Sequence, residues 1–144
     1  MKERELKQLT ELLRTNHALW QRYLEPIINS AGITFVDRII LDNLREDVFS
    51  TKNDLASKLG MPHQNLTRSL ARLEQNGLIA IQKKTGPDLR QIYLSLTRQG
   101  KLINDKINGD INVAWQQVGR NIPEQELASF MSILYRMNSN LLDL

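Results

Sequence analysis

Residues 51–98 place two short amphipathic helices directly before a β-hairpin, and this order constrains the fold more than any other feature of the chain. Gly60 ends the first predicted helix, and the second follows after a tight turn, over residues 62–75. After Gly77 the apolar period changes from 3.6 to 2, which predicts two antiparallel strands within 79–96. Two crossing helices followed by a hairpin are typical of a winged helix-turn-helix, whose second helix can enter a DNA major groove.

Positive charge is concentrated in the same window. Residues 51–98 contain eight Lys and Arg against three acidic residues, a net charge of +5, whereas the whole chain carries +3. The rest of the chain therefore carries −2. Such an uneven distribution favours phosphate binding by the helix-turn-helix and hairpin.

The predicted helix over 62–75 has one apolar and one polar side. Leu66, Leu70 and Leu73 form the apolar stripe. We expect the polar side to contact DNA through Gln64, Asn65, Arg68 and Arg72, with Thr67 on its flank. Asn and Gln can pair with adenine, and Arg can bind guanine or phosphate in a forked geometry. A phosphate is the favoured target of Arg72, and the competing interpretation of the whole side is an ordinary solvated helix face.

The tip of the predicted hairpin combines turn residues with basic side chains. Residues 85–88 read Thr-Gly-Pro-Asp, which is typical of a turn. Lys83, Lys84 and Arg90 flank that turn. We expect them to contact the DNA backbone; the alternative is a hairpin whose charges only confer solubility.

Long amphipathic helices flank the winged region on both sides. We expect a single chain over 1–144, a winged helix-turn-helix region over 33–98, and dimerisation helices over 1–30 and 99–144. The flanking helices have more apolar surface than the small winged region can cover, which favours packing against a second copy. The predicted fold is therefore mainly α with a small antiparallel β-hairpin, and the predicted assembly is a homodimer.

Composition argues against several other classes. The chain has no Cys, which removes disulfides, thiolate metal sites and thiol redox switches. No apolar run is long enough for a membrane helix, and the N-terminus lacks a signal-peptide core, so we expect a cytoplasmic protein. A Gly-rich phosphate loop and a catalytic triad signature are also missing. We expect neither enzymatic activity nor a cofactor.

Several short stretches together resemble the MarR family of bacterial transcriptional regulators. They are Asp54-Leu-Ala56, Leu66-Thr-Arg-Ser-Leu70, Leu73-Glu-Gln-Asn-Gly-Leu-Ile79, Asp88-Leu-Arg90 and Leu94-Ser-Leu-Thr-Arg-Gln-Gly100. Each stretch is weak alone, but the combination is fairly specific, and the similar layout covers essentially the whole chain. The resemblance implies a homodimer with two winged helices and a pseudo-palindromic DNA site.

The resemblance also implies roles for individual residues. Arg90 would be the wing arginine that approaches the minor groove or its phosphates, and Asp88 would orient it. Arg68 falls where the recognition helix of the family contacts DNA. The family often has Arg shortly after Leu-Ile, but here Ile81 occupies that place. Either one phosphate contact is missing, or Lys83 and Lys84 supply it.

Three residues near the N-terminus are candidates for a ligand pocket. His17, Trp20 and Tyr23 recur at helical spacing on one face. We favour packing in the dimer layer; the alternative is the wall of a pocket for a small aromatic or acidic ligand, as the family suggests. A metal site is disfavoured because His17 and His63 are far apart and there is no Cys.

These observations predict a dimeric DNA-binding transcriptional regulator, a repressor released by a small-molecule ligand. The alternative is a winged-helix adaptor whose basic face binds an acidic protein partner.

Overall fold

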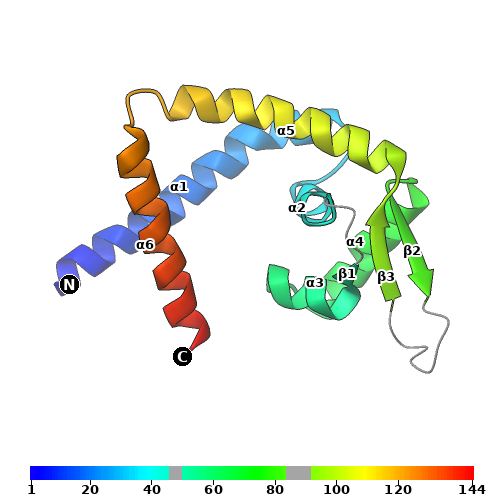
Figure 1. The fold of residues 1–144 in the computed structure, drawn as a ribbon, viewed down its shortest axis with the longest axis horizontal. Coiled ribbons are helices and arrows are strands. Elements are labelled where there is room, and N and C mark those ends of the chain that lie inside the picture. Colours follow the sequence, from blue (N-terminus) through cyan, green and yellow to red (C-terminus); the bar gives the residue numbers. More distant parts are fainter. Residues whose placement is uncertain (46–49, 84–91) are drawn as a thin grey trace. The chain divides into compact units, whose positions relative to one another are not determined.

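The computed structural model describes residues 1–45, 50–83 and 92–144, and confirms a mainly α winged helix-turn-helix fold (Figure 1). The elements in chain order are α1 (Glu3–Ser30), α2 (Phe35–Asn43), β1 (Ser50–Thr51), α3 (Lys52–Leu59), α4 (His63–Gln75), β2 (Ile79–Lys83), β3 (Ile92–Leu96), α5 (Arg98–Val118) and α6 (Glu124–Leu142).

Local sequence accounts for the helix-turn-helix. The hydroxyl of Thr51 accepts a hydrogen bond from the backbone N–H of Asp54 and so caps α3. Gly60 ends α3 in the left-handed conformation, at φ 60°, which glycine adopts at little cost. Pro62 occupies the N-cap position of α4, one residue before the first helical residue. The turn between the two helices is therefore as tight as the sequence predicts.

The strands form a three-stranded antiparallel sheet in the order β1-β3-β2. In the hairpin, Ile79 pairs with Leu96 and Ile81 pairs with Leu94, which places these apolar side chains on one face. The hairpin is the predicted one. The short strand β1, which pairs with β3 at Tyr93 and Leu94, is an addition that the sequence does not predict.

The core is formed by residues of α1, α2, α3, α4, the hairpin and α5 as far as Ile111. Leu55, Leu66, Leu73 and Leu94 are fully or almost fully buried there. The start of α5 approaches the hairpin so closely that a Cβ at Gly100 would overlap the carbonyl oxygen of Leu78. The glycine that ends the Leu-Thr-x-x-Gly motif is thus explained by packing.

Two details of the helices differ from the expectation. A proline at position 26 predicts a kink or an end of the first helix, but Pro26 lies inside α1, which continues to Ser30. The apolar pattern of α2 predicts Val36, Ile39, Ile40 and Leu44 on the inner side; Ile40 and Leu44 are buried, but Leu41 is buried as well and Val36 is exposed.

The chain divides into two compact units, Met1–Ile111 and Asn112–Leu144. The first contains the winged helix-turn-helix, and the second contains the end of α5 and all of α6. Within the described ranges no helix has the length and apolarity that crossing a bilayer requires.

Candidate nucleic-acid interface

Helix α4 packs by one side and is exposed on the other. Leu66, Leu70 and Leu73 are buried, as predicted. The opposite side is exposed and contains Gln64, Asn65, Thr67, Arg68 and Arg72. The hydroxyl of Thr67 donates to the backbone carbonyl of His63, which leaves its oxygen free to accept. The geometry thus presents a polar helix face on a fixed apolar base.

The N-terminal end of α4 has polar groups available for a ligand. No side chain caps this helix, since Pro62 at the N-cap position makes no side-chain hydrogen bond. Backbone N–H groups of a first helical turn have no partner within the helix and favour anions. Gln64 and Asn65 are exposed in the same turn.

Arg72 has an intramolecular partner that the sequence does not predict. Its Nη2 donates to Oδ1 of Asp37 at 2.5 Å and lies 3.5 Å from Oγ1 of Thr34. The side chain of Asp37 is only 3% exposed, whereas that of Arg72 is 45% exposed. The end of α4 is therefore joined to the start of α2.

Asp37 is at the same time part of the cap of α2. The hydroxyl of Thr34 accepts from the backbone N–H of Asp37, and Oδ2 of Asp37 accepts from the backbone N–H of Thr34. This is a reciprocal capping box, with Asp in place of the usual Glu or Gln. The spacing Thr34-x-x-Asp37 is visible in the sequence and could have indicated the cap, although not the bond to Arg72.

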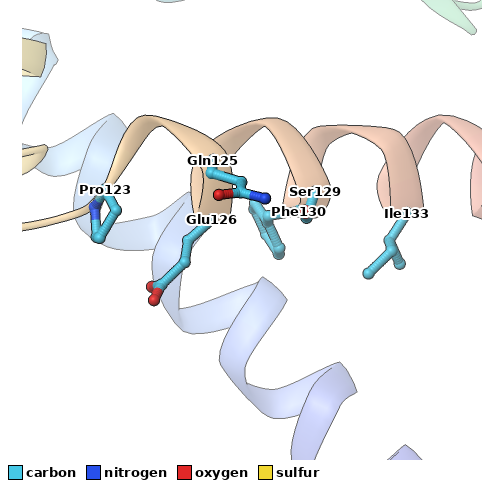
Figure 2. Close-up of a pocket in the computed structure, with 6 residues that line it drawn as sticks. All are labelled: Pro123, Gln125, Glu126, Ser129, Phe130 and Ile133. Carbon is cyan, nitrogen blue, oxygen red and sulfur yellow. The ribbon is translucent and has the colours of Figure 1, made fainter.

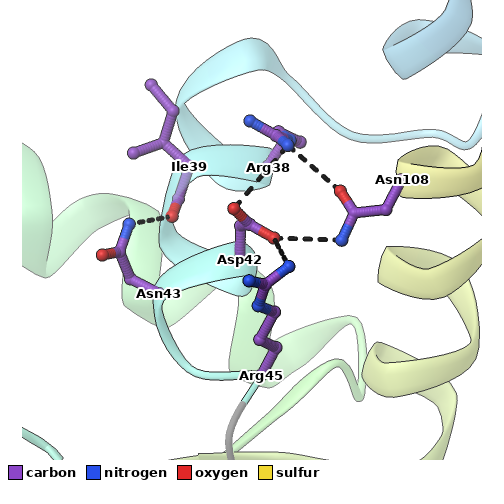
Figure 3. A network of polar contacts seen from close by, with 6 residues as sticks. All are labelled: Arg38, Ile39, Asp42, Asn43, Arg45 and Asn108. Atoms are coloured by element: carbon purple, nitrogen blue, oxygen red, sulfur yellow. Dashed lines mark hydrogen bonds and ion pairs between the residues drawn. The ribbon is translucent and has the colours of Figure 1, made fainter. Parts of the chain in front are cut away.

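A second polar network joins α2 to α5 (Figure 3). The guanidinium of Arg38 donates to Oδ1 of Asn108 at 3.0 Å, and Nδ2 of Asn108 donates to Asp42 at 3.0 Å. Asp42 also pairs with Arg38 at 3.7 Å and with Arg45 at 3.5 Å. Helix α2 is thus held by polar bonds on two sides, toward α4 and toward α5.

The wing lies partly outside the described residues. Lys83 is the last residue of β2. Lys84, Asp88 and Arg90, and the turn over 85–88, fall outside the described ranges, so their predicted roles stay predictions. Ile81, where the family often has Arg, is partly buried and packs against the core.

The predicted pocket residues do not gather around one cavity. The rings of Trp20 and Tyr23 meet edge to face, with centroids 6.4 Å apart. Trp20 packs against the core, while His17 and Tyr23 are exposed. Tyr23 alone of the three lines an open hollow of about 430 Å³ on α1, together with Leu19, Arg22 and Pro26.

A second open hollow, of about 510 Å³, lies on α6. Figure 2 shows Glu126, Phe130 and Ile133 along one side of the helix there. In the parts of the chain that are described, no group of three or more His, Cys, Asp or Glu is placed to bind a metal.

Comparison with known proteins agrees with this geometry. A family model described as winged helix-turn-helix DNA-binding matches residues 36–80, which include α3 and α4. The HTH-type transcriptional regulator FarR of Neisseria gonorrhoeae is 27% identical over 123 residues, which are 85% of this chain and 83% of FarR. The organic hydroperoxide resistance transcriptional regulator of Bacillus subtilis is 29% identical over 126 residues, 85% of each chain.

Solved structures of MarR proteins superimpose over almost the whole chain. A Staphylococcus aureus MarR in complex with salicylate and kanamycin has a TM-score of 0.86 at 17% identity, and covers 98% of this chain and 95% of its own. The chain has the fold of the MarR proteins. The S. aureus MepR–DNA complex has a TM-score of 0.80 at 21% identity and covers 92% and 97%. NadR in complex with 4-hydroxyphenylacetate is 25% identical, with a TM-score of 0.76 and 89% of both chains covered.

These similarities support the prediction of a DNA-binding regulator. Residues 36–80 match the winged helix-turn-helix DNA-binding model, and the relatives named above are transcriptional regulators.

Proposed function

We propose that this chain is a homodimeric repressor that binds a pseudo-palindromic operator and is released by a small aromatic or acidic ligand. Winged helix-turn-helix proteins insert the second helix into the major groove. The observation that carries the proposal is the division of α4, in which three leucines are buried and the polar side is open to solvent. Because operator DNA is its partner, we place the protein in the cytoplasm as part of the same proposal.

The DNA contacts follow from this division. Gln64, Asn65 and Arg68 would face base edges, and Thr67 would bind from the flank of the helix. Lys83, Lys84 and Arg90 of the wing would bind phosphates or the minor groove, with Asp88 orienting Arg90. A net charge of +5 over residues 51–98 supports this assignment.

The dimer part of the proposal rests on exposed apolar side chains. On α1, Leu12 and Leu19 are about 60% exposed. Helix α6 has no buried residue along its 19 positions, although most of its large side chains are apolar. Exposed apolar surface of this extent is unfavourable in water and typical of a protein interface. We infer that a second copy of the chain covers it.

The ligand part of the proposal draws on the relatives and on two buried groups. A relative from Escherichia coli, 26% identical over 112 residues, is a homoprotocatechuate degradative operon repressor, and NadR is bound to 4-hydroxyphenylacetate. In unit Met1–Ile111 the amide of Asn104 and Nε of Arg38 are buried with no hydrogen-bond partner among the described residues. Buried polar groups of this kind normally have a partner, so a small polar ligand near α5 would satisfy them.

A titration of duplex DNA in a series of salt concentrations tests the proposal. We expect selective binding to an operator, with an affinity that falls steeply as salt rises because phosphate contacts release counterions. The adaptor alternative predicts that random and selected duplexes bind equally weakly. Equal affinity for all duplexes at about 150 mM salt would therefore contradict the repressor and favour an acidic protein partner.

A further inference from the structure

The side chain of Arg72 is bonded within the protein at the point where α4 ends. We propose that Arg72 is a positioning residue: its ion pair with Asp37 fixes α4 on α2 and so controls DNA specificity without contacting DNA. This inference rests on the proposed function, because it assigns a role in operator recognition. It replaces the phosphate contact expected for Arg72 from the sequence.

Asp37 is suited to act as an anchor. Its carboxylate is almost fully buried, and Oδ2 is held by the backbone N–H of Thr34 at 3.0 Å. The remaining oxygen, Oδ1, takes the guanidinium of Arg72. A buried carboxylate is stable only when it is paired, so a movement of Arg72 toward a phosphate would leave Asp37 with an uncompensated charge.

Helix α2, to which Arg72 is bonded, is itself held in place. Arg38 and Asp42 of α2 bind Asn108 of α5, each at 3.0 Å (Figure 3). A helix bonded on that side gives Arg72 a fixed partner rather than a mobile one. The ion pair between Arg72 and Asp37 therefore fixes the direction of α4 relative to the other elements of the unit Met1–Ile111.

The pair acts at a distance from the groups that would meet base edges. Arg72 is in the last turn of α4, and Gln64 is in the first. Eight residues of helix separate them, which is about 12 Å along the axis. A small tilt at the bonded end would displace the base-facing end, and hydrogen bonds to base edges are lost within a fraction of an ångström. Specific binding should suffer more than nonspecific binding.

A mutant cycle with the full-length chain tests the inference. The four proteins are wild type, Asp37→Asn, Arg72→Ala and the double variant, each measured on the selected operator and on a random duplex over a range of salt. We expect each single change to lower the ratio of operator to random affinity about tenfold, and the double variant to lose no more than one single change does. On random DNA the salt slope should stay the same in all four proteins.

Asp37→Asn is the decisive variant. Asp37 is buried and cannot contact DNA, and removal of its negative charge should strengthen phosphate binding if charge alone mattered. Asp105→Asn on the exposed side of α5 makes the same change of charge and should leave the ratio unaltered. If Arg72→Ala fails to fold because it leaves a buried charge, Asp37→Asn and the double variant still decide.

Two results would overturn the positioning role alone. One is a wild type that binds its operator selectively while Asp37→Asn binds it with the same selectivity. The other is a salt slope that falls by about 0.9 in Arg72→Ala only, which is the loss expected for one phosphate contact. A wild type with no selectivity between duplexes would instead overturn the proposed function.

Discussion

Gly100 is a position at which the fold leaves no room for a side chain. It lies in the first turn of α5, where its backbone N–H donates to the hydroxyl of Thr97 at 3.0 Å. That hydroxyl in turn donates to the carbonyl of Gly77 at 2.6 Å. The two bonds and the missing Cβ allow α5 to begin directly against the hairpin.

Gly100→Ala should lower the free energy of unfolding by about 3 kcal/mol, because the new Cβ would overlap the backbone of Leu78. Gly109→Ala is the matched control in the same helix. Nothing lies within 4 Å of a Cβ at Gly109, so this change should raise stability by about 0.5–1 kcal/mol. Denaturant unfolding of both variants measures the difference, and equal stabilities would contradict the packing argument.

The ion pair of Arg72 could not be predicted from the sequence. The helical pattern of residues 62–75 correctly places Arg72 on the polar side of the helix. Its partner Asp37 is 35 residues away, and nothing in local periodicity relates the two. Long-range ion pairs depend on how elements pack, and a sequence pattern describes only the elements themselves.

At the scale of elements, α4 and the hairpin are the parts that the sequence predicts best. A sustained apolar stripe and a change of period are strong signals, and both are confirmed. Strand β1 is only two residues long, too short to produce a period, and exists because β3 offers it an edge. Leu41 of α2 packs into the core although the helical pattern does not predict it there.

The first turn of α4 should determine base preference. Gln64 and Asn65 are exposed there, and each can bind adenine through two hydrogen bonds. Asn65→Ala or Gln64→Ala should relax the preference at one A·T pair in each half-site by about 1–3 kcal/mol, with a smaller effect on random DNA. Affinities for a set of single-base operator variants measure this. An unchanged preference in both variants would mean that other side chains determine the sequence.

At the scale of the whole molecule, the missing cysteine limits regulation. One relative is named an organic hydroperoxide resistance regulator, but this chain contains no Cys. Peroxide should therefore not release DNA through a thiol, and any response must involve methionine oxidation or a ligand. Band shifts after peroxide treatment, with and without dithiothreitol, provide the measurement. Recovery of binding by the thiol reductant in the purified protein would contradict this prediction.

In solution the protein should be a dimer of two chains, each of 16.6 kDa. Phe130→Asp introduces a charge into the exposed apolar side of α6 and should shift the mass measured by light scattering toward the monomer or toward aggregates. Asn138→Asp adds the same charge at an exposed polar position and should leave the dimer intact.

Removal of residues 123–144 should cause aggregation or unfolding. A truncated chain that is soluble, monomeric and still bound to its operator would disprove the dimer.

Selection of bound sequences from random duplex DNA by the full-length protein tests whether the chain recognises DNA as a two-fold dimer. A two-fold dimer presents two copies of α4 to the same side of the duplex. The selected sites should therefore be inverted repeats whose half-site centres are about 10–11 base pairs apart, or a small multiple of that distance. At least one A·T pair should be fixed in each half-site. Enriched sequences without two-fold symmetry, or no enrichment at all, would contradict operator recognition by a symmetric dimer.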